Sequence, residues 1–244
     1  MTSALQTTHT QRSLIDHVTR YRMTVIPAIE QLTGFRGLSR HVLREELQQL
    51  CCSKILGSAS LFRDRHYYYL ANAGHEAGTG TDNTASRHFG PLSEVAKIRN
   101  YAMLSFCCLS QQRRQRLTVE DIQRFVPDLY RIGMPSSYYV EADGPHSRLG
   151  FLRVDTGGHS RWDRILAKAR EDIRTHSLFE SISEFVDRGL FEVSIVTALP
   201  QKAARLQQAI EDWPVEQRSL IRVAACPELI NLIAPPPRTA RNNH

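Results

Sequence analysis

The sequence predicts a mixed α+β fold, in which a helical N-terminal part with a β-hairpin precedes a C-terminal half of alternating strands and helices. In the N-terminal part, apolar residues recur at helical spacing. From residue 137 onward, short β-rich runs alternate with amphipathic segments in the order β-β-α-α-β-α-β. That order indicates an α/β layer built on a mixed sheet.

Three helices are expected before residue 53. The first opens at Thr10 or Ser13, and the second fits residues 24–32. The third begins after Ser39, whose side chain is expected to serve as the N-cap, and ends near Cys52. A short apolar piece at residues 54–56 follows, then a polar loop at residues 63–66 and a strand at residues 67–70. Helices followed by strand, basic loop and strand are the order of a winged helix-turn-helix, which we place at residues 10–76.

The charge of the chain favours a polyanionic partner. The net charge is +6 and the isoelectric point about 9.2. In a winged helix-turn-helix the third helix enters the DNA major groove and the loop reaches the backbone. Arginine suits both guanine edges and phosphates. We therefore expect DNA contacts from the third helix, the hairpin and a basic run at residues 111–116, namely Arg36, Ser39, Arg40, His41, Arg44, Lys54, Arg63, Arg65, His66, Arg113 and Arg114. For the basic run, a solvated helix end favoured by the helix dipole is the alternative.

A Gly-, Thr- and Ser-rich linker at residues 77–90 follows the hairpin. Bridging helices are expected at residues 91–126, the first from Pro91 to about Gln112 and the second capped by Thr118 together with Asp121. The α/β half then spans residues 127–233, with its most convincing strand at residues 191–199, nearly continuous in apolar residues and expected to be buried. The ends of the chain, residues 1–9 and 234–244, are expected to be disordered.

Several classes of function find no signature in the sequence. The five cysteines show no CxxC spacing, so a zinc ribbon is not expected, and buried free thiols in a reducing cytoplasm are the favoured interpretation. His146, His159 and His176 fit no recognised metal-ligand spacing. No signal peptide or membrane-length apolar run is present. We expect a cytoplasmic protein with no membrane partner and no cofactor.

The second hairpin strand carries a family resemblance. Residues 68–74 read Tyr-Tyr-Leu-Ala-Asn-Ala-Gly, which resembles the "Y-hydrophobic-L-T-x-x-G" strand of the replication-relaxation family of plasmids and integrative elements. Ala71 stands where the family has Thr. The resemblance extends over residues 10–215, and it implies that the C-terminal half is similar to the PD-(D/E)xK nuclease fold.

The resemblance also implies where nuclease acids would lie. The family's Pro-Asp dyad falls at Pro135-Ser136, and its Glu-x-Asp triplet falls at residues 153–155. Ser136 and Arg153 thus replace two acids, whereas Asp155 and a helical lysine, Lys168, remain. A metal-dependent nuclease needs converging carboxylates. We therefore expect no catalysis, with Asp155 and Lys168 left as a remnant or an ion pair.

Three functions are compatible with these patterns. The first is a sequence-specific double-stranded DNA-binding protein, a transcriptional regulator carried by a mobile genetic element. Such a protein is expected to act as a homodimer, with the C-terminal half open to a protein partner or an effector. The second is a plasmid replication or mobilisation factor with metal-dependent nicking activity. The third is a protein-interaction module that uses the winged helix as a scaffold.

Overall fold

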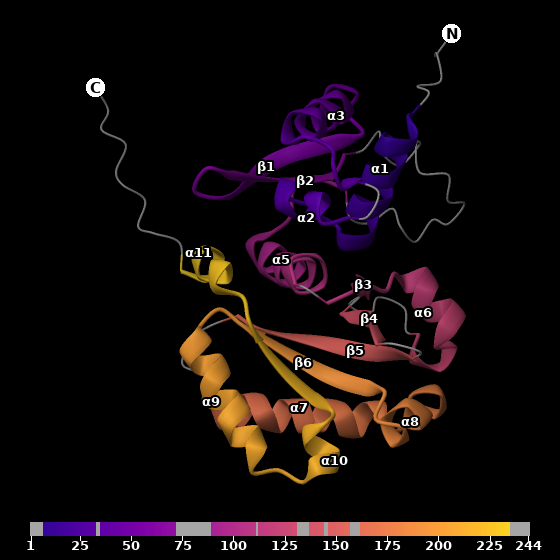
Figure 1. Ribbon diagram of the computed structural model, residues 1–244, viewed down its shortest axis with the longest axis vertical. Helices are drawn as coiled ribbons and strands as arrows, with labels where there is room; N and C mark the ends of the chain where they lie inside the picture. Colours follow the sequence, from indigo (N-terminus) through magenta and orange to yellow (C-terminus); the bar gives the residue numbers. More distant parts are fainter. Residues whose placement is uncertain are drawn as a thin grey trace.

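The computed structural model describes residues 7–32, 35–71, 89–110, 112–130, 137–143, 146–156 and 162–234. It has a mixed α+β fold with a two-stranded hairpin and a five-stranded mixed sheet. Figure 1 shows the helices and hairpin of the N-terminal unit (residues 7–71) on one side of α5 and the five-stranded sheet on the other. The predicted linker at 77–90, apart from residues 89 and 90, and the tail at 235–244 lie outside the described residues.

The N-terminal unit contains α1 (His9–Tyr21), α2 (Ile26–Glu30), α3 (Arg40–Cys52), β1 (Leu56–Phe62) and β2 (Arg65–Leu70). Helix α1 begins earlier than predicted, because Thr8 rather than Thr10 or Ser13 caps it through a reciprocal capping box with Gln11. Ser39 caps α3 as predicted, and its hydroxyl accepts a hydrogen bond from the backbone N–H of Val42 at 3.3 Å.

The hairpin differs from its prediction in length. The sequence predicts only a short apolar piece at residues 54–56, whereas strand β1 extends to Phe62. The added residues include small ones of weak strand propensity, so the pattern does not predict a strand there. Only residues 63 and 64 form the turn, so Arg65 and His66 belong to β2 and not to a loop. The hairpin is fastened to the helices by a two-way backbone bridge between Thr24 and Tyr68, with both N···O distances 2.9 Å.

Helix α5 (Glu94–Cys108) separates the N-terminal unit from the sheet, and its residues 100–108 are buried on all sides. Its apolar cluster includes Met23 and Leu61 of the N-terminal unit together with Tyr139 and Val196 of the sheet. The helix ends at Cys108, earlier than the predicted Gln112. Residues 114–116 instead form β3 (Arg114–Arg116), which corrects the interpretation of the basic run as a helix end.

The five strands are β3, β4 (Tyr138–Asp143), β5 (His146–Asp155), β6 (Phe191–Thr197) and β7 (Ile221–Ala225), in that spatial order. Strands β3, β4 and β5 pair antiparallel, and β5, β6 and β7 pair parallel. The predicted order β-β-α-α-β-α-β agrees with the structure except that a short helix, α10 (Val215–Arg218), lies between α9 and β7. Strand β6 is buried along its whole length as expected.

Helices cover both faces of the sheet (Figure 1). The face opposite α5 packs against α7 (Trp162–His176), α8 (Glu180–Asp187) and α9 (Pro200–Glu211). The remaining elements are α6 (Val119–Phe125), η3 (Pro127–Leu129), α10 (Val215–Arg218), η4 (Pro227–Leu229) and α11 (Ile230–Ile233). The predicted capping box of Thr118 and Asp121 at the start of α6 is confirmed.

One side chain ties three strands together on the α5 face of the sheet. The Tyr139 ring reaches from β4 across Gly150 of β5, so that its hydroxyl donates to Glu192 of β6 and lies 2.7 Å from Ser194 Oγ. A Cβ atom at Gly150 would lie 2.0 Å from Tyr139 Cζ. Gly150 is therefore required by the path of the ring and not by its own backbone dihedral angles.

We predict that Gly150→Ala destabilises the fold by about 1–3 kcal/mol, because the new methyl group must displace a buried ring. Urea unfolding measures the free energy of unfolding. In a Tyr139→Ala background, which removes the ring, the same substitution should cost much less. An equal cost in both backgrounds would contradict the assigned contact.

A buried histidine predicts the acid sensitivity of the N-terminal unit. His17 Nε2 lies 3.0 Å from Thr24 Oγ1, and burial lowers the pKa of His17 from 6.5 to about 4, with the charge of Arg20 acting in the same direction. The unfolded chain therefore binds the proton more readily than the folded one. The stabilisation is complete above pH 6.5 and is lost as the pH falls toward 4.

Accordingly, His17→Gln should flatten the decline in the free energy of unfolding between pH 6.5 and 4, by an amount on the order of 3 kcal/mol. Urea unfolding at several pH values in that range measures the free energy of unfolding of the variant and of wild type. The difference between the two proteins cancels the contribution of other titrating groups. The exposed His66→Gln serves as control and should leave the slope unchanged. Equal slopes in wild type and His17→Gln would show that His17 does not titrate in this way.

Candidate nucleic-acid interface

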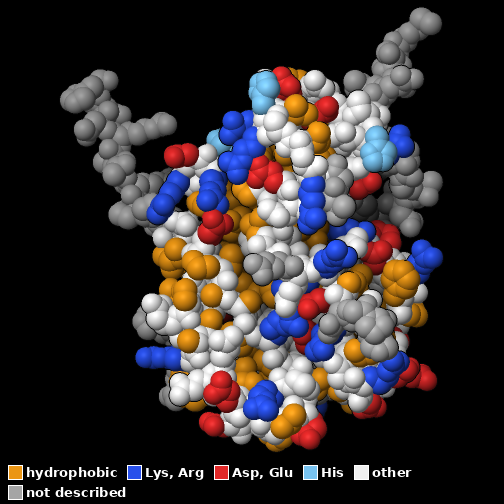
Figure 2. Space-filling view, in the orientation of Figure 1, with side chains coloured by type: hydrophobic (Ala, Val, Ile, Leu, Met, Phe, Trp, Pro, Cys, Tyr) orange, Lys and Arg blue, Asp and Glu red, His pale blue; other side chains and the backbone are white. Residues whose placement is uncertain are grey.

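The predicted DNA contacts mostly lie on one region of the surface. Of these eleven side chains all but Arg114 are exposed, and those before residue 67 belong to α3, to the segments next to it or to the hairpin. Figure 2 shows Lys and Arg side chains over α3 and the β1–β2 hairpin, with acidic side chains among them. We call this region the α3–hairpin face; it comprises Arg36, Ser39, Arg40, His41, Arg44, Lys54, Arg63, Arg65 and His66.

The end of α3 is fixed by local geometry. Lys54 adopts a left-handed conformation with φ of 58°. Its N–H donates to Cys51 O at 3.0 Å, and the N–H of Ile55 donates to Leu50 O at 3.0 Å. This pair of bonds is the Schellman motif, which ends a helix and turns the chain away. It turns the chain from α3 into β1 and leaves the Lys54 side chain exposed.

Two cations of the α3–hairpin face are already paired with carboxylates. Two nitrogens of Arg40, Nε and Nη2, donate to the carboxylate of Glu30 in α2, with Nη2 3.1 Å from Oε2. Arg65 Nη1 lies 2.6 Å from Glu228 Oε1 in η4, and Glu228 also accepts a hydrogen bond from the Tyr101 hydroxyl of α5.

Other cations of this face have no such partner among the residues that the structure describes. Within those ranges, no salt bridge involves Arg36, Arg44, Lys54 or Arg63. Arg63 occupies the hairpin turn in a left-handed conformation with φ of 49°. The positive charge of this face that no described carboxylate neutralises thus comes from both α3 and the hairpin.

Arg114 is not part of this surface, which corrects its prediction as a DNA contact. Its side chain is only 4% exposed, its Nε lies 2.6 Å from Glu141 Oε2, and its guanidinium lies 3.8 Å above the Phe106 ring. Arg116 is equally buried, where it donates to Tyr21 O and Asn100 Oδ1 at 2.9 Å, and burial lowers its pKa to about 10. The alternation Arg-Gln-Arg is the sequence signal for a strand that turns both arginines inward. Arg113, in contrast, is exposed as predicted.

A charge cluster on the α5 face of the sheet has no signature in the sequence. Glu141 and Glu192 are both buried, and Arg222 bridges them with N···O distances of 2.9 and 3.0 Å. Arg114 binds Glu141, and Arg148 Nη1 lies 3.7 Å from Glu192 Oε2. These five side chains, one from each strand, form the buried charge cluster. Both carboxylates already form ion pairs with arginines of other strands, so the cluster connects the strands of the sheet.

Two of the four positions that the nuclease resemblance singled out, Arg153 and Asp155, are also engaged in ion pairs. Arg153 makes two 2.6 Å bonds to Asp172 of α7. Asp155 lies 2.7 Å from Lys202 Nζ of α9 and accepts a hydrogen bond from Thr197 at 3.0 Å. Of the two alternatives for Asp155 and Lys168, a remnant or an ion pair, the ion pair between them is wrong: α7 turns Lys168 to the surface, and Lys202 of α9 is the partner of Asp155.

Metal binding is the other chemistry at issue in this half of the chain. Ser136 and His159 lie outside the described residues. Among the residues that the structure describes, no group of three or more His, Cys, Asp or Glu side chains could hold a metal ion. His176 is buried, with Nε2 2.8 Å from the Tyr138 hydroxyl and Nδ1 2.6 Å from Asp172 O. Its contacts are those of a core residue.

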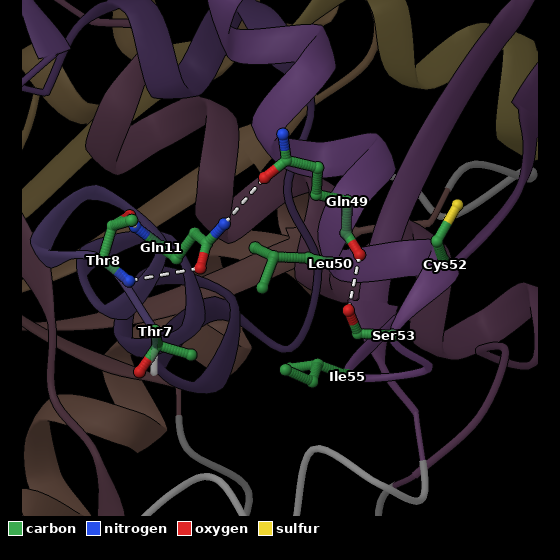
Figure 3. Close-up of a pocket in the computed structure, with 8 residues that line it drawn as sticks. All are labelled: Thr7, Thr8, Gln11, Gln49, Leu50, Cys52, Ser53 and Ile55. Atoms are coloured by element: carbon green, nitrogen blue, oxygen red, sulfur yellow. Dashed lines mark hydrogen bonds between the residues drawn. The ribbon is translucent and has the colours of Figure 1, made fainter. Parts of the chain in front are cut away.

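A pocket of about 430 Å³ lies where the start of α1 meets the end of α3 (Figure 3). Its lining is Thr7, Thr8, Gln11, Gln49, Leu50, Cys52, Ser53 and Ile55. None of these side chains is charged, and Gln11 donates across the pocket to Gln49 at 3.1 Å. The pocket lies between two helices, and its lining contains no acid–base pair that could carry out catalysis.

We predict that Glu141→Gln destabilises the fold by about 3–5 kcal/mol, since it leaves the charge of buried Arg114 without a counter-ion. The control is Glu94→Gln, which removes the exposed partner of Lys97 and should cost no more than about 1 kcal/mol. Chemical denaturation measures both. Similar costs for the two variants would show that the buried charge cluster is not structural.

The comparisons with known proteins add no support to the resemblance to the replication-relaxation family, which is based on short sequence motifs alone. No protein-family model matches the chain, and no curated protein matches it. Within the described residues, no helix is both long and apolar enough to cross a membrane.

Proposed function

We propose that this protein binds double-stranded DNA sequence-specifically through the α3–hairpin face and acts as a transcriptional regulator carried by a mobile genetic element. The N-terminal unit would then be a winged helix-turn-helix. The observation that carries this proposal is the presence, on both α3 and the adjoining hairpin turn, of exposed cations that pair with no described carboxylate.

The geometry of the N-terminal unit supports this assignment. The B-DNA major groove admits an α-helix. Helix α3 buries Leu43, Leu47 and Leu50, and its other side is exposed. The hairpin places Arg63 at its turn, where a backbone phosphate can be reached beside the groove. Cations on two elements allow one helix to enter the groove and a second element to fix its register.

The C-terminal half supports a binding function over the alternative of a nicking enzyme. If its fold is nuclease-like, the positions expected to hold a metal are used otherwise: Arg153 pairs with Asp172, and Asp155 pairs with Lys202. The buried carboxylates Glu141 and Glu192 are bound by arginines. These pairs stabilise the sheet layer, so the exposed cations of the N-terminal unit remain the best candidates for function.

The test is selection from a random duplex library followed by mobility shift at several salt concentrations. Arg44→Ala with Arg63→Ala should weaken binding and reduce the slope of log affinity against log salt by about one for each arginine that binds a phosphate. The matched control is Arg205→Ala with Arg218→Ala, which removes two exposed arginines from α9 and α10 on the far side of the sheet (Figure 1).

The control should bind like wild type. If the wild-type protein selects no duplex from the library, the proposal of DNA binding fails. If the two double variants lose affinity equally, the protein does not bind DNA through the α3–hairpin face.

A further inference from the structure

We infer that base sequence is read by His41, Glu45 and Gln48, and that Glu45 selects a cytosine. This inference rests on the proposed DNA-binding function. It moves the reading of bases away from the arginines of α3, which the sequence suggests, and assigns it to a stripe that contains His41, Glu45 and Gln48 but no arginine.

Helical geometry defines the stripe. Leu43, Leu47 and Leu50 are at most 1% exposed and mark the inner side of α3. Residues spaced by four, three and four positions share one face of a helix. Residues 41, 45, 48 and 52 have that spacing, are all exposed, and lie opposite the three leucines. The side chains of His41 and Glu45 are 80% and 55% exposed.

The arginines of α3 lie on the flank of this stripe. Arg40 is turned back onto α2 by its two bonds to Glu30. Arg44 lies on the side of β2: burial raises the pKa of Tyr68 there, and the nearby charge of Arg44 opposes the rise. These positions suit the groove walls, where phosphates lie.

Chemistry assigns roles within the stripe. A carboxylate accepts a hydrogen bond from cytosine N4, and a glutamine side chain pairs with adenine N6 and N7. The His41–Glu45 contact, with Nε2 3.2 Å from Oε1, is an exposed i, i+4 pair of low strength that can be exchanged for contacts to bases. Gln49, by comparison, is held by Gln11 at the pocket.

The negative charge of Glu45 is the strongest reason to assign it a contact with a base. A carboxylate at the centre of a surface that meets a polyanion lowers affinity for every sequence, because like charges repel. Its position is favourable only where it gains a hydrogen bond from a base donor. Such a group gives specificity by penalising wrong partners.

The experiment compares the base preferences selected by wild type, Glu45→Gln and the control Asp16→Asn. Both variants remove one negative charge from the N-terminal unit, but Asp16 lies on α1 and not on the stripe. Glu45→Gln should lose preference for cytosine at one position of each site by about five- to a hundredfold, and it should bind unrelated duplex more tightly. Asp16→Asn should keep the wild-type preference. Both residues are exposed, and a thermal melt confirms folding.

The outcomes separate the two proposals. If the wild-type protein selects no duplex, the proposed function fails and this assignment fails with it. If wild type selects a site and Glu45→Gln keeps its full base preference, DNA binding stands and the assignment of Glu45 is wrong.

Discussion

The burial of α5 is the contact on which the rest of the structure depends. Residues 100–108 of this helix are all buried, between the N-terminal unit on one side and the sheet on the other. Such a helix cannot be solvated on either side without exposing a large apolar area. The N-terminal unit and the sheet therefore share one apolar cluster, and the α3–hairpin face is carried on a support that includes the C-terminal half.

Polar contacts fix the register of this packing. Arg116 reaches from β3 to Tyr21 at the end of α1, and Arg20 of α1 binds Asp121 at the start of α6 at 2.6 Å. Arg65 of the hairpin pairs with Glu228 of η4. Directional bonds of this kind specify an orientation that apolar contacts alone leave loose. The hairpin is thus positioned both by Thr24 and by an element more than 150 residues further along the chain.

Paired and exposed arginines have different uses in this protein. Arginines on the strands of the sheet pair with carboxylates, as the buried charge cluster and the Arg153–Asp172 pair show. Arg44 and Arg63 of the N-terminal unit are exposed and pair with no described carboxylate. A paired, buried arginine stabilises the fold and is unavailable to a ligand, whereas an exposed one adds little to stability and can bind a phosphate. Net charge from composition cannot distinguish these two kinds of arginine.

The sequence by itself determined the elements whose cause is local. Ser39 and Thr118 were recognised as caps, and the buried strand β6 and the order of the C-terminal elements followed from apolar patterns, because all of these depend on neighbours along the chain. Only the tertiary structure decided which charges are paired: Arg114 is turned inward, and Asp155 binds Lys202 and not Lys168. It also showed that Glu45 and not an arginine lies on the outermost line of α3, because the outward direction of a helix is set by what its inner side packs against.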